Sequence, residues 1–148
     1  MKKTKNKPIK KKIFPTWGWI VLGVILLAII GLIVVLNVSL KTVALPQEIT
    51  VAQAAKLHDQ GAFILDVREP SEWIQFHIAG AKLIPLGELP NRLNEVPKDQ
   101  TVVVVCRTGH RSAQGRDILL NAGYTHVTSM TGGLTEWQAQ GMPTVSGQ

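Results

Sequence analysis

A run of β-branched residues near the middle of the chain is the feature that most constrains the fold. Residues 101–105 read TVVVV, without any alternation of apolar and polar side chains. In a strand with one solvent-exposed face, apolar and polar residues alternate. A central strand of a parallel sheet is covered on both faces, so its residues are apolar throughout. The run therefore predicts a buried parallel strand with helices on both sides of its sheet.

The segments around this run alternate between short apolar stretches and helical patterns. Thr50 and Gln53 have the spacing of a capping box at a helix start. Strands that alternate with helices predict βαβ units with right-handed crossovers. We therefore expect an α/β domain over residues 47–148. Its further strands are predicted at 62–65, 81–85 and 126–130, its helices at 50–60, 70–76, 112–121 and 134–140, and irregular helical turns at 86–93.

The N-terminal part of the chain has a different character. Residues 18–36 read GWIVLGVILLAIIGLIVVL, nineteen residues without a charge. A helix of that length rises about 28 Å, close to the roughly 30 Å hydrocarbon core of a bilayer. We predict a transmembrane helix over 17–40, between a basic tail at 1–16 and a linker at 41–46. A cleaved secretory signal is the alternative, although its apolar region usually spans only about 7–15 residues.

Charge is unevenly distributed along the chain. The net charge is +6, yet residues 1–44 hold eight lysines and no acidic residue, and the remainder holds eight Lys and Arg against ten Asp and Glu. A nucleic-acid footprint should lie on a folded basic face, so we expect no nucleic-acid partner. The positive-inside rule predicts a cytoplasmic N-terminus and an extracytoplasmic C-terminal domain.

Cys106, the single cysteine, directly follows the TVVVV run and opens the segment CRTGHRS, after which a helix is expected. Ligands of open α/β sheets bind at the carboxyl ends of strands. Backbone N–H groups of the turn, together with Arg107 and Arg111, favour a thiolate, the nucleophilic form of cysteine. We therefore predict Cys106 as a nucleophile, with a buried structural cysteine as the alternative. One cysteine excludes an intramolecular disulfide and a cysteine-built metal site.

Four segments, in order, resemble the rhodanese family: DVREPSEW at 66–73, HIAGA at 77–81, CRTGHRS at 106–112 and a closing GGL segment from 132. The resemblance covers about residues 47–145. It implies a five-stranded parallel sheet with helices on both faces. It also implies a sulfurtransferase whose cysteine alternates between thiolate and persulfide, without a metal or organic cofactor.

The resemblance further implies the substrates. Cys106 would accept sulfane sulfur from a donor such as thiosulfate and pass it to a thiol or cyanide. Cysteine phosphatases have the spacing C-x5-R, whereas this loop has C-x4-R, which favours sulfur transfer over phosphatase or arsenate reductase activity. The residues expected to bind substrate are Arg107, Thr108, Gly109, His110 and Arg111.

For two charged residues outside the loop, the sequence allows two interpretations. Asp66 and Arg68 follow a predicted neighbouring strand and would border the site, but a structural ion pair or cap is the favoured interpretation, because such networks also imitate active sites. The alternative function for the whole protein is a non-catalytic rhodanese-like module that binds a partner or senses redox state at the membrane.

Overall fold

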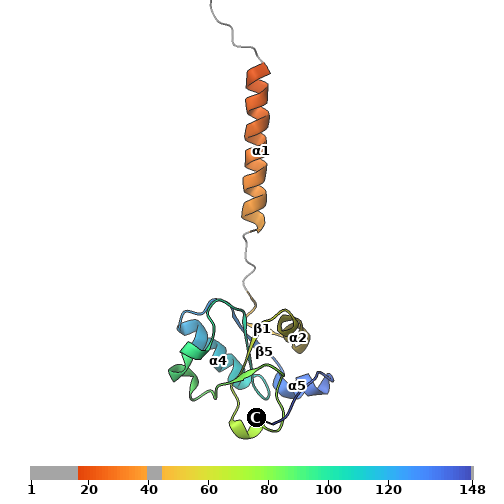
Figure 1. Cartoon of the computed structure of the whole chain (residues 1–148), viewed down its shortest axis with the longest axis vertical. Coiled ribbons are helices and arrows are strands. Elements are labelled where there is room, and N and C mark those ends of the chain that lie inside the picture. Colours follow the sequence, from red (N-terminus) through yellow and green to blue (C-terminus); the bar gives the residue numbers. More distant parts are fainter. Residues whose placement is uncertain (1–16, 40–44, 148) are drawn as a thin grey trace, which may run out of the picture. The chain divides into compact units, whose positions relative to one another are not determined.

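The computed structural model describes residues 17–39 and 45–147, with the side chains of 19 and 34–39 left out. The chain divides into two units, Met1–Val43 and Ala44–Gln148. The first contains the helix α1, Trp17–Ser39, drawn in orange in Figure 1. Among the described residues, we find no helix that combines the length and the apolar character needed to cross a membrane. The structure therefore does not support the predicted transmembrane helix, and the tail at 1–16 lies outside the described residues.

The second unit is built on a five-stranded sheet in the order β1-β5-β4-β2-β3, in which every pair of neighbours is parallel. The predicted five-stranded parallel sheet is thus confirmed, with the TVVVV run at its centre. The strand β1 was not predicted from the sequence, because two residues are too few to show a period. The strands are β1 Glu48–Ile49, β2 Phe63–Asp66, β3 Lys82–Leu83, β4 Val102–Val105 and β5 Val127–Met130.

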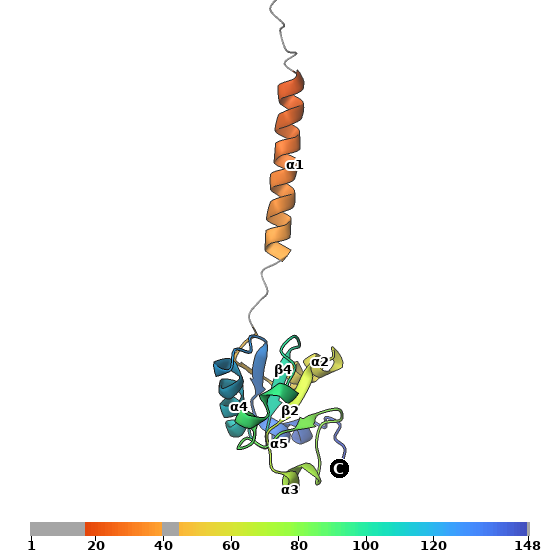
Figure 2. The same cartoon turned by 60° about the vertical axis from the view of Figure 1, so that its left-hand side comes forward.

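Helices cover both faces of this sheet. In Figure 1, α4 lies on one side of the strands and α2 and α5 lie on the other, and Figure 2 shows β2 beside β4 between these layers. The capping box of Thr50 and Gln53 is present at the start of α2. The helix α4 begins two residues earlier than predicted, and α3 is a single turn. The helices are α2 Val51–Asp59, α3 Pro70–Trp73, α4 His110–Asn121 and α5 Gly133–Ala139, with 3-10 turns at Leu89–Asn91 and Leu93–Glu95.

Alternate valines of β4 enter two separate apolar clusters. Val104 packs in the cluster that contains Leu119 of α4. Val103 packs in the cluster that contains Leu134 and Trp137 of α5. All four residues of β4 are fully buried. This double coverage fixes the position of the residue that follows the strand, Cys106.

Candidate active site

Cys106 lies at the carboxyl end of β4, and only 1% of its surface is exposed. The chain then turns back over the sulfur. The backbone N–H of Gly109, the residue that precedes α4, donates to Cys106 Sγ at 3.1 Å. An N–H donor aimed at sulfur stabilises negative charge on it. One amide of the predicted loop therefore points at the sulfur.

A hydroxyl that was not predicted as a site residue lies on the other side of the sulfur. Ser112 is fully buried, and its Oγ is 3.7 Å from Cys106 Sγ, where it accepts from the thiol. The same hydroxyl donates to the Gly109 carbonyl at 2.7 Å. A hydroxyl rotates freely and both donates and accepts, so Ser112 is able to follow the sulfur between thiol and thiolate. Its place directly after Arg111, in the first turn of a helix, was the only signal in the sequence.

The start of α5 fixes the backbone of the loop. The N–H of Leu134 donates to the Cys106 carbonyl at 2.8 Å, and the N–H of Thr135 donates to the Arg107 carbonyl at 2.9 Å. Gly133 has a φ of +59°, and a Cβ built there would lie 2.5 Å from the carbonyl carbon and oxygen of Arg107. Only glycine permits both this conformation and this close approach. The turn at Gly132 and Gly133 therefore packs directly against the backbone of the Cys106 loop and holds it in place.

Arg111 is paired with a carboxylate from a distant part of the sequence. Its two terminal nitrogens lie 2.7 and 2.9 Å from the two carboxylate oxygens of Glu72 in α3. This hydrogen-bonded pairing lowers the pKa of Glu72 and raises the pKa of Arg111, which the negative charge of a Cys106 thiolate also raises. The predicted positive charge of Arg111 is therefore close to the sulfur but balanced by Glu72. The sequence offered no sign of this partner beyond an acidic residue in the segment DVREPSEW.

Asp66 and Arg68 form the structural ion pair that the sequence favoured. Both are buried, with 0% and 1% of their surfaces exposed. Arg68 Nη2 lies 2.7 Å from Asp66 Oδ2, and Arg68 Nε donates to both carboxylate oxygens. Arg68 also donates to the carbonyls of Phe76 at 2.8 Å and Glu72 at 3.4 Å. The pair therefore holds the segment that carries Glu72.

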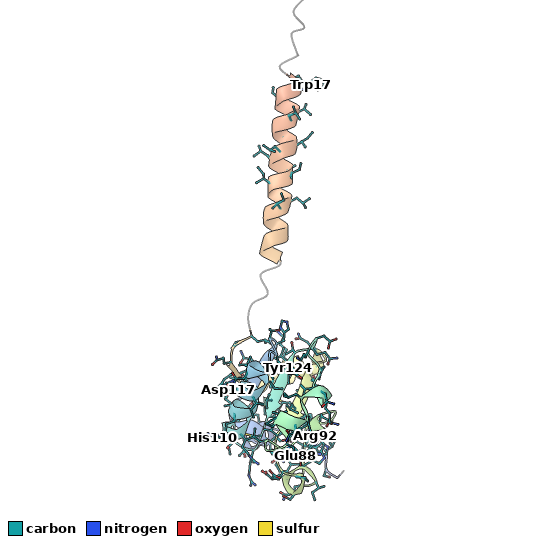
Figure 3. All side chains as sticks on the ribbon, turned by 90° about the vertical axis from the view of Figure 1, so that its left-hand side faces the viewer. Trp17, Glu88, Arg92, His110, Asp117 and Tyr124 are labelled. Atoms are coloured by element: carbon teal, nitrogen blue, oxygen red, sulfur yellow. The ribbon has the colours of Figure 1, made fainter. Side chains whose placement is uncertain are left out.

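The remaining predicted loop residues face outward. Arg107, Thr108 and His110 are exposed, and His110 is labelled at the surface in Figure 3. Among the described residues, none of these three side chains forms a hydrogen bond with the sulfur. Thr108, Gly109 and His110 instead line a hollow of about 320 Å³, which Glu48 of the edge strand β1 also lines.

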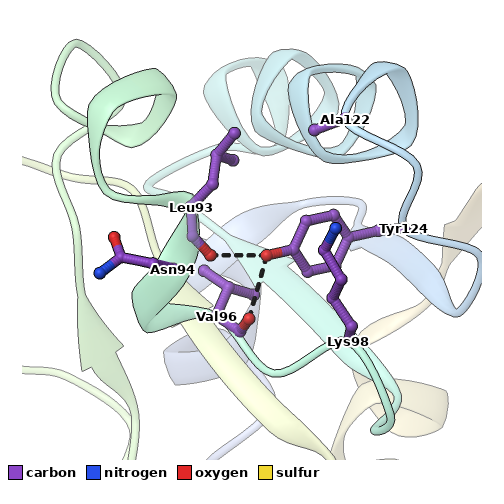
Figure 4. Close-up of a pocket in the computed structure, with 6 residues that line it drawn as sticks. All are labelled: Leu93, Asn94, Val96, Lys98, Ala122 and Tyr124. Atoms are coloured by element: carbon purple, nitrogen blue, oxygen red, sulfur yellow. Dashed lines mark hydrogen bonds between the residues drawn. The ribbon is translucent and has the colours of Figure 1, made fainter.

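A larger hollow of about 390 Å³ lies elsewhere on the domain (Figure 4). Tyr124 is one of the residues that line it, and the tyrosine hydroxyl donates to the carbonyls of Leu93 and Val96. Lys98 lies over the tyrosine ring at 5.2 Å. Lys98 precedes β4, whereas Cys106 follows it, so this hollow is at the opposite end of the sheet from the sulfur. Cys106 does not line it, and we do not regard it as the reaction site.

The chain resembles known proteins over this same domain. A family model described as "Rhodanese-like domain" matches residues 50–140. A protein named sulfurtransferase from Allochromatium vinosum is 37% identical over 87 residues, which cover 59% of this chain and 81% of that protein. Thiosulfate sulfurtransferase PspE of Escherichia coli K12 is 44% identical over 85 residues, covering 56% and 78% of the two chains.

Solved structures agree with the sequence matches. The crystal structure of a rhodanese-related protein from Thermoplasma volcanium superimposes with a TM-score of 0.63 at 31% identity, covering 68% of this chain and 98% of that one. The family match spans more than half of the chain and includes the Cys106 loop. The chain therefore belongs to the family of proteins with a rhodanese-like domain.

Proposed function

We propose that the protein is a sulfurtransferase that carries sulfane sulfur as a persulfide on Cys106. The observation that carries the proposal is the placement of Cys106 Sγ between the Gly109 N–H at 3.1 Å and the Ser112 hydroxyl at 3.7 Å. Both groups are able to hydrogen-bond a Cys106 sulfur that is a thiolate before the reaction and carries a second sulfur atom afterwards. The sulfurtransferase relatives support the same activity at the level of the family.

The proposed reaction has two covalent steps. The Cys106 thiolate attacks the sulfane sulfur of a donor, so that a new S–S bond forms on Cys106 and the bond to the rest of the donor breaks. The electron pair leaves with the donor, which departs as sulfite when the donor is thiosulfate. A thiol or cyanide acceptor then attacks the outer sulfur and releases the Cys106 thiolate. No oxidant or reductant is consumed.

The loop spacing supports sulfur transfer over phosphate chemistry. Arg111 is the fifth residue after Cys106, and the loop returns so closely that the Gly109 N–H already contacts the sulfur. A loop of this size accommodates one further sulfur atom more readily than a tetrahedral oxyanion. We therefore expect neither phosphatase nor arsenate reductase activity.

Mass spectrometry of the intact protein tests the proposal. Incubation with thiosulfate is expected to add one sulfur atom, about 32 Da, which a thiol reductant removes. Cys106→Ala is the matched control and should gain no mass, because the chain has no other cysteine. An unchanged mass of the folded native protein, with thiosulfate and also with a small organic persulfide as donor, would favour the non-catalytic binding or redox-sensing module instead.

The location of the domain is a separate proposal, and it rests on the sequence. We propose that residues 17–40 attach the protein to a membrane, with the N-terminus in the cytoplasm and the domain on the other side. Support comes from seven lysines before the apolar run and from the absence of any charged residue in 18–36. An uncharged apolar stretch of nineteen residues in a sequence is typical of a membrane-spanning segment. Carbonate extraction and protease treatment of intact cells test the attachment and the orientation.

A further inference from the structure

The pair of Glu72 and Arg111 changes what the site offers to a substrate. The guanidinium is bound by both carboxylate oxygens, at 2.7 and 2.9 Å. Its side chain is 31% exposed and that of Glu72 is 17% exposed, so the pair lies at the surface of the site rather than in the core. An arginine held in this two-pronged manner has fewer donors and less net charge for an incoming anion.

The other charges near the loop add at most one uncompensated positive charge to the site. Arg68 is neutralised by Asp66 in the buried pair. Glu69 is exposed and close enough to Arg111 to affect its electrostatics. Arg107 is exposed, and no ion pair of its side chain is found within 45–147. Arg111 is therefore offset by Glu72 and, more weakly, by Glu69, and Arg107 is the one arginine of the loop that keeps its charge within the described residues.

We propose that Glu72 is a specificity-determining residue that disfavours dianionic sulfur donors such as thiosulfate and favours small persulfides R–S–SH with an uncharged organic group R, which carry at most one negative charge. This inference rests on the proposed sulfurtransferase activity. With a persulfide R–S–SH, the Cys106 thiolate attacks the terminal sulfur, the bond between the two donor sulfurs breaks, and R–S⁻ leaves with the electron pair. The proton stays with the new persulfide or the released thiolate, and no further reactant is needed.

The expected size of the effect follows from Coulomb's law. A dianion interacts twice as strongly as a monoanion with any fixed charge, so removal of the Glu72 charge should help thiosulfate more than a persulfide. For a partly exposed site we expect Glu72→Gln to raise kcat/KM for thiosulfate by about three- to tenfold, with a smaller gain for a persulfide. The glutamine is nearly isosteric and retains a hydrogen-bond acceptor for Arg111.

The test compares two donors in four forms of the full-length protein. The donors are thiosulfate and 2-hydroxyethyl persulfide, the measurement is the rate of sulfur loading on Cys106, and the result is the ratio of the two kcat/KM values. We expect the ratio to rise in Glu72→Gln, to fall in Arg111→Gln, where the Glu72 charge stands alone, and to return near the native value in the double variant. The control is Asp59→Asn, which removes one negative charge from the end of α2. That end leads into the amino end of β2, at the opposite end of the parallel sheet from Cys106, and the ratio should not change.

Two results would overturn the inference. Equal losses for both donors in Glu72→Gln would mean that Glu72 only positions the loop, and an unchanged ratio would mean that its charge does not reach the donor. A charge effect should also weaken in 1 M salt, whereas a positioning effect should not. Failure of the native protein to load sulfur from either donor would refute the proposed function itself. Loading from both with an unchanged ratio would refute only the role of Glu72.

Discussion

Two arginine–carboxylate pairs lie near Cys106, and they differ in burial more than in geometry. Each has a closest nitrogen–oxygen distance of 2.7 Å. Asp66 and Arg68 are two residues apart and have almost no exposed surface, whereas Glu72 and Arg111 are 39 residues apart and partly exposed. A buried pair cannot open without leaving an unpaired charge in the core, while an exposed pair exchanges with water at little cost. The first pair therefore belongs to the scaffold, and the second is free to respond to a ligand.

The two pairs are also connected. Arg68 donates to the backbone carbonyl of Glu72, so the buried pair holds the helical turn from which the exposed pair reaches the loop. The hydrogen bond runs through the backbone of α3, and the positive charge of Arg68 also helps to lower the pKa of the Glu72 carboxyl. A change at Arg68 should therefore disturb both pairs, whereas a change at Glu72 should leave Asp66 and Arg68 in place.

The largest expected effect comes from breaking the buried pair. Arg68→Met leaves the Asp66 carboxylate buried without a partner, and we expect it to reduce the free energy of unfolding by about 3–5 kcal/mol. Urea denaturation followed by near-ultraviolet circular dichroism measures the change. The matched control is Arg92→Met, which removes an arginine from a surface network with Glu88 and Glu95. If the two variants lost the same free energy of unfolding, burial would not be what distinguishes the Asp66–Arg68 pair from a surface pair.

A smaller effect, dependent on pH, is expected from the exposed pair. Arg111 lowers the pKa of Glu72 from its ordinary value of 4.5 in the folded protein. The pair therefore stabilises the fold above pH 4.5, and this contribution disappears as the pH falls through the lowered pKa. Glu72→Gln should reduce the free energy of unfolding by less than about 1 kcal/mol at pH 7. In strong acid, where Glu72 is protonated, the two proteins should be almost equally stable. Denaturation curves of both proteins across this range check whether the difference narrows; a constant difference would point to lost packing.

The smallest effect is expected from the surface network around Arg92. The hydrogen bond from Arg92 and, to a smaller extent, the hydrogen bond from Lys82 lower the pKa of Glu95 to about 2. Glu95 therefore stays charged throughout the usual pH range. These side chains are about a third exposed or more, and water and salt screen them. We expect Glu95→Gln to leave the urea midpoint unchanged within error, in low and in high salt. If the urea midpoint of Glu95→Gln shifted as much as that of Glu72→Gln, the pair at the site would contribute no more to stability than a pair on the surface.

The parts of this molecule that were predictable from sequence are those encoded locally. The TVVVV run and the capping box at Thr50 depend on neighbouring residues, and both were found where predicted. Cys106 was placed at the carboxyl end of a central strand because the strand itself was evident. Glu72 and Arg111 meet only after β2 and β4 have paired, and a single sequence contains no record of that contact. Ser112 was overlooked for a different reason, since a serine at a helix start usually serves as a cap and not as a neighbour of a nucleophile.

The contact of Gly133 with the Arg107 peptide has a consequence for protein engineering. Residues 106–112 do not hold their shape by themselves, because the backbone carbonyls of Cys106 and Arg107 are bound by the first amides of α5. Transplanting only this heptapeptide to another α/β scaffold would leave those carbonyls without donors and would meet a Cβ wherever the recipient lacks the second glycine. The transferable module consists of two strand-to-helix corners, and a redesign of sulfur specificity should move them together.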